Sequence, residues 1–338
     1  MNYILRSFLV GIVFLMVTGC VKNSGVKIKD DNFLQALIQQ GIDTDGDGDI
    51  SFSEAEAVTT LDISSSFISN LKGIEAFVNL DSLICRENMI PGFDASYNAA
   101  LRYLDCEYNQ ITNLIVEKNL ALEYLYCSAN KLTTIDVSKN LSLLHLGCTA
   151  NDIDSLDVSK NTKLLFLSCG TNKLTALDIS KNKSLLALLC AENKLTKLDI
   201  SSNSLLAYLI CGSNKLTNID LSKNYALKRL LCEKNQLTAL NAIYNPVLYE
   251  LNCQGNKIAS LILPVNNSMT TLDCSDNLLQ ALDLTYNNKL VNIRIGNMPS
   301  LTKVCVWILP FPPAGNSITL STEGSPNLYF ANDCRKKN

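Results

Sequence analysis

Five acidic side chains crowd one short segment, at spacings that suit a hard cation. Residues 43–54 read Asp-Thr-Asp-Gly-Asp-Gly-Asp-Ile-Ser-Phe-Ser-Glu. Oxygen atoms recur at alternate positions, and a central glycine permits a sharp turn. Calcium prefers oxygen ligands of this kind. The candidate ligands are Asp43, Asp45, Asp47, Asp49 through its backbone carbonyl, Ser51 through a bridging water, and Glu54 through both carboxylate oxygens.

This segment resembles the twelve-residue EF-hand loop. Ile50 stands where the apolar residue of such a loop packs, and Phe33, Leu37 and Ile38 give the preceding segment an apolar helical face. A solvated acidic turn without a metal is the alternative. Dockerins, which this loop also resembles, have two copies, whereas this sequence has one. The resemblance implies a single, structural calcium ion.

Catalytic chemistry finds little support. The chain has one histidine, His145, so a Ser–His–Asp or Cys–His set must include it. Its position within a repeat gives it no special partner. We therefore expect that the protein is not an enzyme.

Ten cysteines recur at strict intervals of 21 residues. Such a column suggests a metal ladder or stacked disulfides, but Ile63 and Ile295 occupy the equivalent slot in the flanking copies. Neighbouring strands lie about 4.8 Å apart, whereas the Cβ atoms of a disulfide prefer about 3.8 Å. We predict buried, reduced thiols that act as small apolar groups. They are Cys85, Cys106, Cys127, Cys148, Cys169, Cys190, Cys211, Cys232, Cys253 and Cys274.

The elements that carry these residues follow from the repeat itself. Counting from Leu122, each copy has apolar residues at positions 1, 4, 6, 11, 14 and 16, and asparagine at positions 9 and 19. Alternation around positions 3 to 6 predicts one short strand per copy. At position 9 a buried amide can satisfy backbone groups that a turn leaves unpaired. The same role is expected for the second asparagine.

The pattern resembles the leucine-rich repeat, with cysteine in place of one leucine, and is most similar to the internalin type. The resemblance covers roughly residues 58–300. It implies an α/β-type solenoid with a parallel sheet on the concave face, an irregular convex side and a small helical N-terminal cap. Internalin-like proteins carry an EF-hand-like cap where residues 28–57 lie, and they bind other proteins.

The concave face is the predicted interaction surface. Side chains at positions 3 and 5 point away from the core, and aromatic and aliphatic residues gather there in the central copies. An apolar patch with a polar rim marks an interaction site, and tyrosine is a frequent anchor. Strand propensity alone is the alternative explanation. The predicted contact residues are Tyr103, Tyr124, Tyr126, His145, Phe166, Leu189, Tyr208 and Ile210.

The segment 301–338 is predicted to cap the open end of the stack, since a solenoid must cover its last copy. Leu301, Val304 and Val306 restart the apolar pattern only 11 residues after Leu290. Two cysteines outside the ladder, Cys305 and Cys334, flank this segment. A disulfide between them is a hypothesis that the sequence leaves open.

The N-terminus indicates export. Residues 8–17 form a short apolar core, and Val-Thr-Gly-Cys20 resembles a bacterial lipobox. The resemblance implies cleavage before Cys20 and lipidation of its thiol; a plain signal peptide or a single-pass anchor is the alternative. Residues 21–27 would form a linker. Val21 replaces the Asp that resembles an inner-membrane retention signal, so we expect a lipid-anchored envelope protein, with the outer membrane favoured.

Composition agrees with a globular binding protein. The chain of 338 residues is 47% hydrophobic with a net charge of −3, and it has no basic stripe of the kind that binds nucleic acid. We expect a monomer that binds a protein partner as an adhesin or interaction protein. The alternative is a structural or glycan-binding module of an envelope complex.

Overall fold

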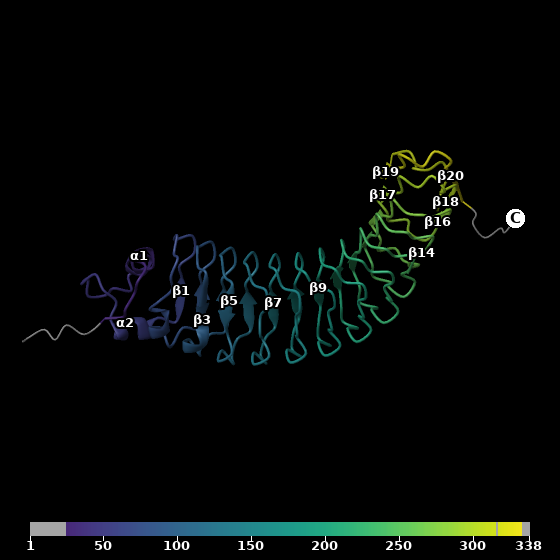
Figure 1. Ribbon diagram of the computed structural model, residues 1–338. Helices are drawn as coiled ribbons and strands as arrows, with labels where there is room; N and C mark the ends of the chain where they lie inside the picture. The colour runs from purple at the N-terminus through teal and green to yellow at the C-terminus, as the bar shows by residue number, and fades with distance from the viewer. Residues whose placement is uncertain (1–24, 316, 333–338) are drawn as a thin grey trace, which may run out of the picture.

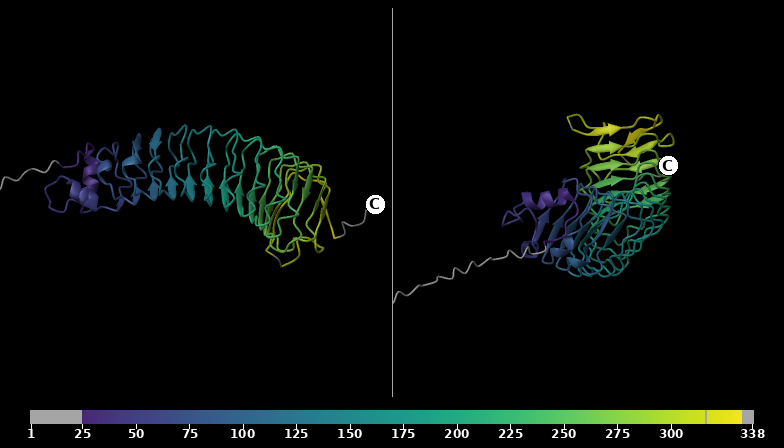
Figure 2. Two further views of the ribbon diagram at one scale, coloured as in Figure 1. Left: turned by 90° about the horizontal axis from the view of Figure 1, so that it is seen from below. Right: turned by 60° about the vertical axis from the view of Figure 1, so that its left-hand side comes forward.

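One short parallel strand in each coil builds the molecule. The structure is a computed structural model that describes residues 25–315 and 317–332. It is a curved stack of coils, with helices only at the N-terminal end (Figure 1). In the left view of Figure 2 the long sheet follows the inner side of the curve. The predicted solenoid with a concave parallel sheet is confirmed.

Thirteen strands form this sheet, and each pairs in parallel with its neighbours. Their register joins equivalent repeat positions, so that Leu125 faces Leu104 on one side and Leu146 on the other. In order, the strands are β1 (Thr60–Asp62), β2 (Ser82–Ile84), β4 (Tyr103–Asp105), β6 (Tyr124–Tyr126), β7 (His145–Gly147), β8 (Phe166–Ser168), β9 (Ala187–Leu189), β10 (Tyr208–Ile210), β11 (Arg229–Leu231), β13 (Glu250–Asn252), β15 (Thr271–Asp273), β17 (Asn292–Arg294) and β19 (Thr319–Ser321).

Smaller sheets form where the chain returns along another side of the coil. They are β3 (Gly92–Asp94) with β5 (Asn113–Ile115), β12 (Ala239–Asn241) with β14 (Ser260–Ile262), and β16 (Ala281–Asp283) with β18 (Lys303–Cys305) and β20 (Tyr329–Ala331). Short 3-10 helices occupy Ile74–Ala76 and Ala95–Tyr97.

The segment after Leu301 is placed differently from the restart that its pattern predicts. Its strand β18 pairs with β16 on the side sheet, and not with the concave sheet. Leu301, Val304 and Val306 thus complete the coil that Leu290 begins, with an added residue shifting the spacing. The next strand of the concave sheet is β19, which pairs with β17.

Two helices cover the N-terminal end of the stack. Asp30 caps α1 (Asp31–Gln39) by accepting from the amides of Asn32 and Phe33, and its other oxygen accepts from the Ser69 amide at 2.8 Å. The Phe33 ring lies 6.4 Å from Phe77 of the first coil. This end of the core is therefore closed by aromatic packing and by a side-chain hydrogen bond.

The asparagines satisfy the turns as predicted. Asn130 accepts from the Ile111 amide at 2.9 Å and donates to the carbonyls of Cys106 and Cys127, both at 3.0 Å. In the second ladder Asn140 donates to Val116 and Asn119 of the preceding coil, both at 2.9 Å. Each amide thus joins two adjacent coils.

The ladder cysteines are free, fully buried thiols. Burial raises the pKa of Cys148 to about 12 and raises the pKa values of the others, so the column is uncharged. Ile63 and Ile295, in the equivalent slot, are equally buried. The slot is a core position that favours a small apolar group.

We predict that Cys169→Ala lowers the free energy of unfolding by about 1–2 kcal/mol, because it leaves a small void. Cys169→Asp should cost well above about 3 kcal/mol, because it buries an unpaired charge. Urea titration followed by circular dichroism measures both. Thiols found oxidised or metal-bound in the native protein would contradict the packing account.

Candidate functional site

The acidic loop lies between α1 and α2 (Phe52–Ala57) at the N-terminal end. Ligand oxygens of Asp43, Asp45 and Asp47 all lie within 4.8 Å of one another. Backbone amides shape the loop around them: Gly46 donates to Asp43 at 2.8 Å, and Gly48 donates to its other oxygen at 3.0 Å. The structure brings together three of the predicted ligands.

Glu54 lies next to this group but is held by protein donors. One of its oxygens accepts from the amide and hydroxyl of Thr44 at 2.6 and 2.7 Å. The other accepts from the amide and hydroxyl of Ser51 at 2.8 and 2.9 Å. These bonds, the one from the Ser51 amide first, lower the pKa of Glu54 to about 2.

These residues fit a hard cation in part. Three converging carboxylates are the donor set that calcium prefers, and Asp49 and Ser51 follow at the expected places in the loop. Glu54 is outside the group of three and caps α2 through a capping box with Ser51. Binding through both oxygens of Glu54 would have to replace those hydrogen bonds. The calcium site therefore stays a prediction.

The second candidate site is a row of rings on the concave sheet, formed by Tyr103, Tyr124, Tyr126, His145 and Phe166. We call these five residues the aromatic row. Ring centroids of successive members lie 5.0–6.0 Å apart: Tyr103 is 6.0 Å from Tyr124, and His145 is 5.0 Å from Tyr124 and 5.6 Å from Phe166. Such spacing is typical of favourable aromatic pairs, so the surface is formed before any partner binds.

Tyr126 lies across the row because Gly147 leaves it room. These residues face each other in the register of β6 and β7. A Cβ atom built at Gly147 would lie 3.0 Å from the Tyr126 ring. The tyrosine hydroxyl lies 3.3 Å from Nδ1 of His145. Any side chain at position 147 would displace the ring, a role for this glycine that the repeat pattern does not reveal.

The row is apolar and uncharged near neutral pH. Burial lowers the pKa of His145 and raises the pKa values of Tyr103 and Tyr126. The partner residues predicted further along, Leu189, Tyr208 and Ile210, lie on β9 and β10, and Tyr208 is 39% exposed. All eight predicted residues therefore lie on one sheet, on five consecutive strands from β6 to β10 and on β4 beside them.

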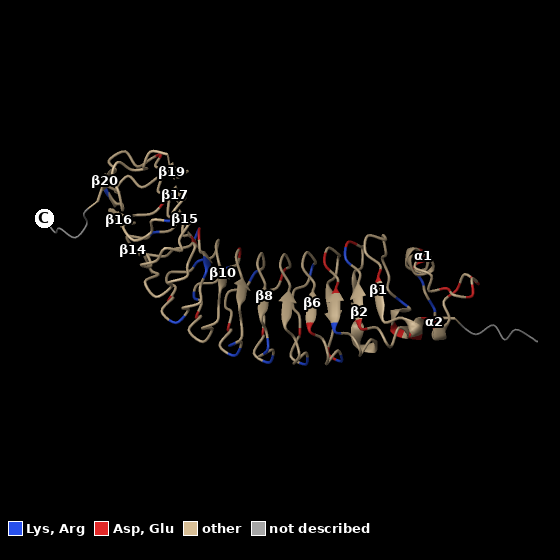
Figure 3. Cartoon of the chain, turned by 180° about the vertical axis from the view of Figure 1, so that it is seen from behind, with Lys and Arg blue, Asp and Glu red and all other residues tan. Residues whose placement is uncertain are grey.

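Charged residues flank this surface as pairs. At one end Arg86 lies 3.9 Å from Asp105, whose pKa is raised by burial. At the other end Arg229 and Glu250 approach to 2.7 Å. Lys and Arg also gather at the turns on the opposite edge of the coils, as Figure 3 shows. The apolar section of the concave face thus has a polar rim.

Three predictions concern residues at the chain ends. Cys20 and Cys334 lie outside the described residues, so lipidation and the proposed pairing stay predictions. Cys305 is fully buried and disulfide-bonded. No helix within the described ranges has the length and apolar character needed to cross a membrane.

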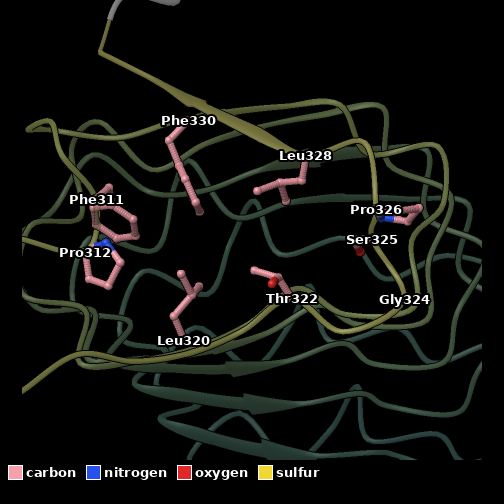
Figure 4. A pocket seen from close by; sticks show the side chains of 9 residues that line it. All are labelled: Phe311, Pro312, Leu320, Thr322, Gly324, Ser325, Pro326, Leu328 and Phe330. Atoms are coloured by element: carbon pink, nitrogen blue, oxygen red, sulfur yellow. The ribbon is translucent and has the colours of Figure 1, made fainter.

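Sequence reasoning missed two apolar surfaces. Ile243, Tyr244, Val265 and Tyr286 are 46–62% exposed at turns where earlier copies carry serine and lysine. A cavity of about 520 Å³ opens at the C-terminal end of the stack, lined among others by Phe311, Leu320 and Phe330 (Figure 4). A comparison of the repeats with one another would have found the first surface.

A regular solenoid with a concave apolar surface defines a leucine-rich-repeat protein of the binding class. No protein-family model and no curated protein matches the sequence. Among solved structures, the functional domain of InlJ from Listeria monocytogenes, described as including a cysteine ladder, is 32% identical over 82% of this chain and 74% of that one, with a TM-score of 0.63. This chain belongs to the internalin family of leucine-rich-repeat proteins.

Two further structures show the same fold. Internalin InlF from Listeria monocytogenes is 18% identical, covers 91% of this chain and 96% of its own, and has a TM-score of 0.72. YopM, a leucine-rich effector protein from Yersinia pestis, is 20% identical over 88% of this chain and 92% of its own, with a TM-score of 0.62. These likenesses favour binding over catalysis.

We predict that the N-terminal cap weakens as the pH falls through the range between about 4.5 and 2. The hydrogen bonds hold the folded-state pKa of Glu54 at about 2, below the usual value of about 4.3. The stabilisation is therefore complete above the unfolded pKa and is lost as the pH falls through the folded one. Glu54→Gln in a calcium chelator should be less stable at pH 7 and less sensitive to acid. Identical acid titrations of both proteins, followed by Trp and Tyr fluorescence, would contradict this.

Proposed function

We propose that this protein binds a protein partner through the concave face of its solenoid, as an interaction protein or adhesin of the bacterial cell envelope, and that it is not an enzyme. The aromatic row carries the proposal. Its rings are already packed against one another on a rigid sheet, so little side-chain entropy is lost on binding.

Burial and chemistry of the row support this reading over strand propensity alone. The five rings are half-buried against one another, and Gly147 serves the placement of Tyr126 rather than the core. Tyrosine combines a large apolar ring with a hydrogen-bonding hydroxyl, which makes it a frequent anchor in interfaces. His145 shares the surface and has ring neighbours instead of an acid or a nucleophile, which supports a binding role for the only histidine.

The binding prediction can be tested on the row directly. Tyr124→Ala with Tyr126→Ala should weaken partner binding by about 2–4 kcal/mol and leave the melting curve nearly unchanged. A pull-down from neighbouring or host cells with the chain lacking its leader, followed by titration calorimetry with the captured protein, provides the measurement.

Convex variants are the matched controls for this experiment. Tyr244→Ala removes an equally large exposed ring, and Lys139→Ala with Lys160→Ala removes charge from the turns. Both should bind normally. Equal loss in these variants, or none in the concave double variant, would place the interface elsewhere. Capture of an envelope glycan by the same face would favour the glycan-binding alternative.

We further propose that the protein is a lipoprotein, anchored through Cys20 and held at the outer membrane where the cell has one. The lipobox supports this, together with the lack of a membrane-spanning helix within residues 25–315 and 317–332. The solenoid would then stand on a lipid tether that leaves the concave face accessible.

We expect Cys20→Ala to release the protein from the membrane fraction without unfolding it, because the thiol is the predicted site of the lipid. Fractionation after a high-salt wash, with Cys169→Ala as the control for loss of a thiol, measures this. A variant that stays in the membrane would exclude lipidation at Cys20. Protease treatment of intact cells then separates a surface adhesin from a periplasmic module.

We also propose that the acidic loop holds one structural calcium ion. Asp43, Asp45 and Asp47 converge, and without a cation their like charges repel one another. An ion that binds only the folded state would add about 2.7 kcal/mol at a hundredfold excess over its dissociation constant.

Calcium should raise the melting temperature of the native chain, and Asp43→Ala with Asp45→Ala should abolish that rise. Glu54→Gln separates two roles of Glu54: a retained calcium response would assign it to capping alone. Asp31→Asn, outside the loop, is the control for lost charge. An unchanged response in the double variant would show that the loop is not the site.

A further inference from the structure

The two ends of the stack differ. The N-terminal end is closed by α1, and both Phe33 and Leu61 beneath it are fully buried. At the other end β19 and β20 are the outermost strands of their sheets. Within the described residues, each therefore has a strand neighbour on one side only. Outward backbone donors and acceptors at strand spacing are best satisfied by another strand.

An apolar cavity lies between these two strands. It measures about 520 Å³ and is bordered by Leu320, Leu328, Phe330 and Phe311, whose side chains lie around a common space in Figure 4. Thr322 holds the repeat position that cysteine fills in the inner coils. The cavity is thus the core of the solenoid, left open where the next coil would continue it.

The end of the stack is nearly free of charge. From Val304 to Asn332 the only charged residue is Glu323. The strands β19 and β20 carry none of the lysines, acids or prolines that usually protect an exposed edge. Beside them Ile308, Leu309 and Tyr329 are 42–54% exposed.

Residues 333–338 are a poor cover for this surface. Their sequence is Asp-Cys-Arg-Lys-Lys-Asn, in which four of six residues are charged, and burying them in an apolar cavity would be costly. The occupant must present two strand edges on either side of an apolar core. The end of the solenoid itself has this form, and its lack of charge means that an identical surface is not repelled.

We propose that two copies of this chain dock end to end through their C-terminal coils. The edge strands β19 and β20 pair antiparallel across a two-fold axis, and the two open cores close against each other. A closed two-fold contact uses the same patch on both copies and stops at a dimer. The concave faces stay free, so the proposal is independent of the proposed function. It replaces the monomer that the sequence alone suggests.

The test uses the chain from residue 21 to 338, measured by sedimentation equilibrium over about a hundredfold range of concentration. The wild-type chain should form a dimer. Thr319→Lys with Ser321→Lys places like charges along the paired edge, and both side chains are exposed. This variant should associate at least tenfold more weakly.

Asn292→Lys is the matched control. Asn292 is exposed and faces Thr319 in the register of β17 and β19, one coil further from the end. Its lysine would lie about 14 Å from its symmetry mate, three strand spacings, which exceeds the screening length of about 8 Å. This variant should dimerise normally.

Hydrogen exchange identifies the contact. Amides of β19 and β20 should be protected at high concentration and exchange faster after dilution, while those of β8 stay constant. A wild-type chain that is monomeric throughout would overturn the proposal. So would a dimer that survives the double lysine substitution, or one without protection of β19 and β20.

Discussion

The backbone of each turn must find hydrogen-bonding partners inside the stack, and the rest of the structure depends on how asparagine meets that demand. Leaving buried amides and carbonyls unpaired at both corners of every coil would cost far more than the net stability of a domain. One asparagine side chain at the first corner accepts one bond and donates to carbonyls of two coils, as Asn130 does. Because each amide reaches back to the preceding coil, it fixes the register as well as the turn.

A fixed register explains why the same side chains form columns. Leu104, Leu125 and Leu146 lie side by side because their backbones pair directly, and the thiols follow two residues later. A sulfur atom fits a column whose members are one strand spacing apart and adds little bulk, whereas burial keeps it protonated. The same regularity sets the rings of the aromatic row at stacking distance on the outer face. One geometric constraint thus makes both the core and the candidate interface.

Much of this could be predicted from the sequence, because it repeats. Each of the ten cysteines and each asparagine carries the same information, so one register satisfies all copies. Prediction failed where the repetition ends. Leu301 was assigned to a new copy since an added residue had shifted the spacing, and only the pairing of β18 with β16 shows that it completes the old one. Contacts of single copies, such as Tyr126 over Gly147, depend on neighbours that a repeat pattern averages away.

Glu54 illustrates a different limit. Its place in the loop suits a metal ligand, yet its place before α2 also suits a helix cap, and one carboxylate cannot make both sets of contacts at once. The sequence cannot rank these uses, because each depends on where Thr44 and Ser51 direct their hydrogen-bond donors. With those donors in place, the cap remains folded against the first coil without a cation, and calcium would act by relieving repulsion among the three aspartates. The cap and the calcium site are then separable, and the stability of the solenoid need not follow the supply of calcium.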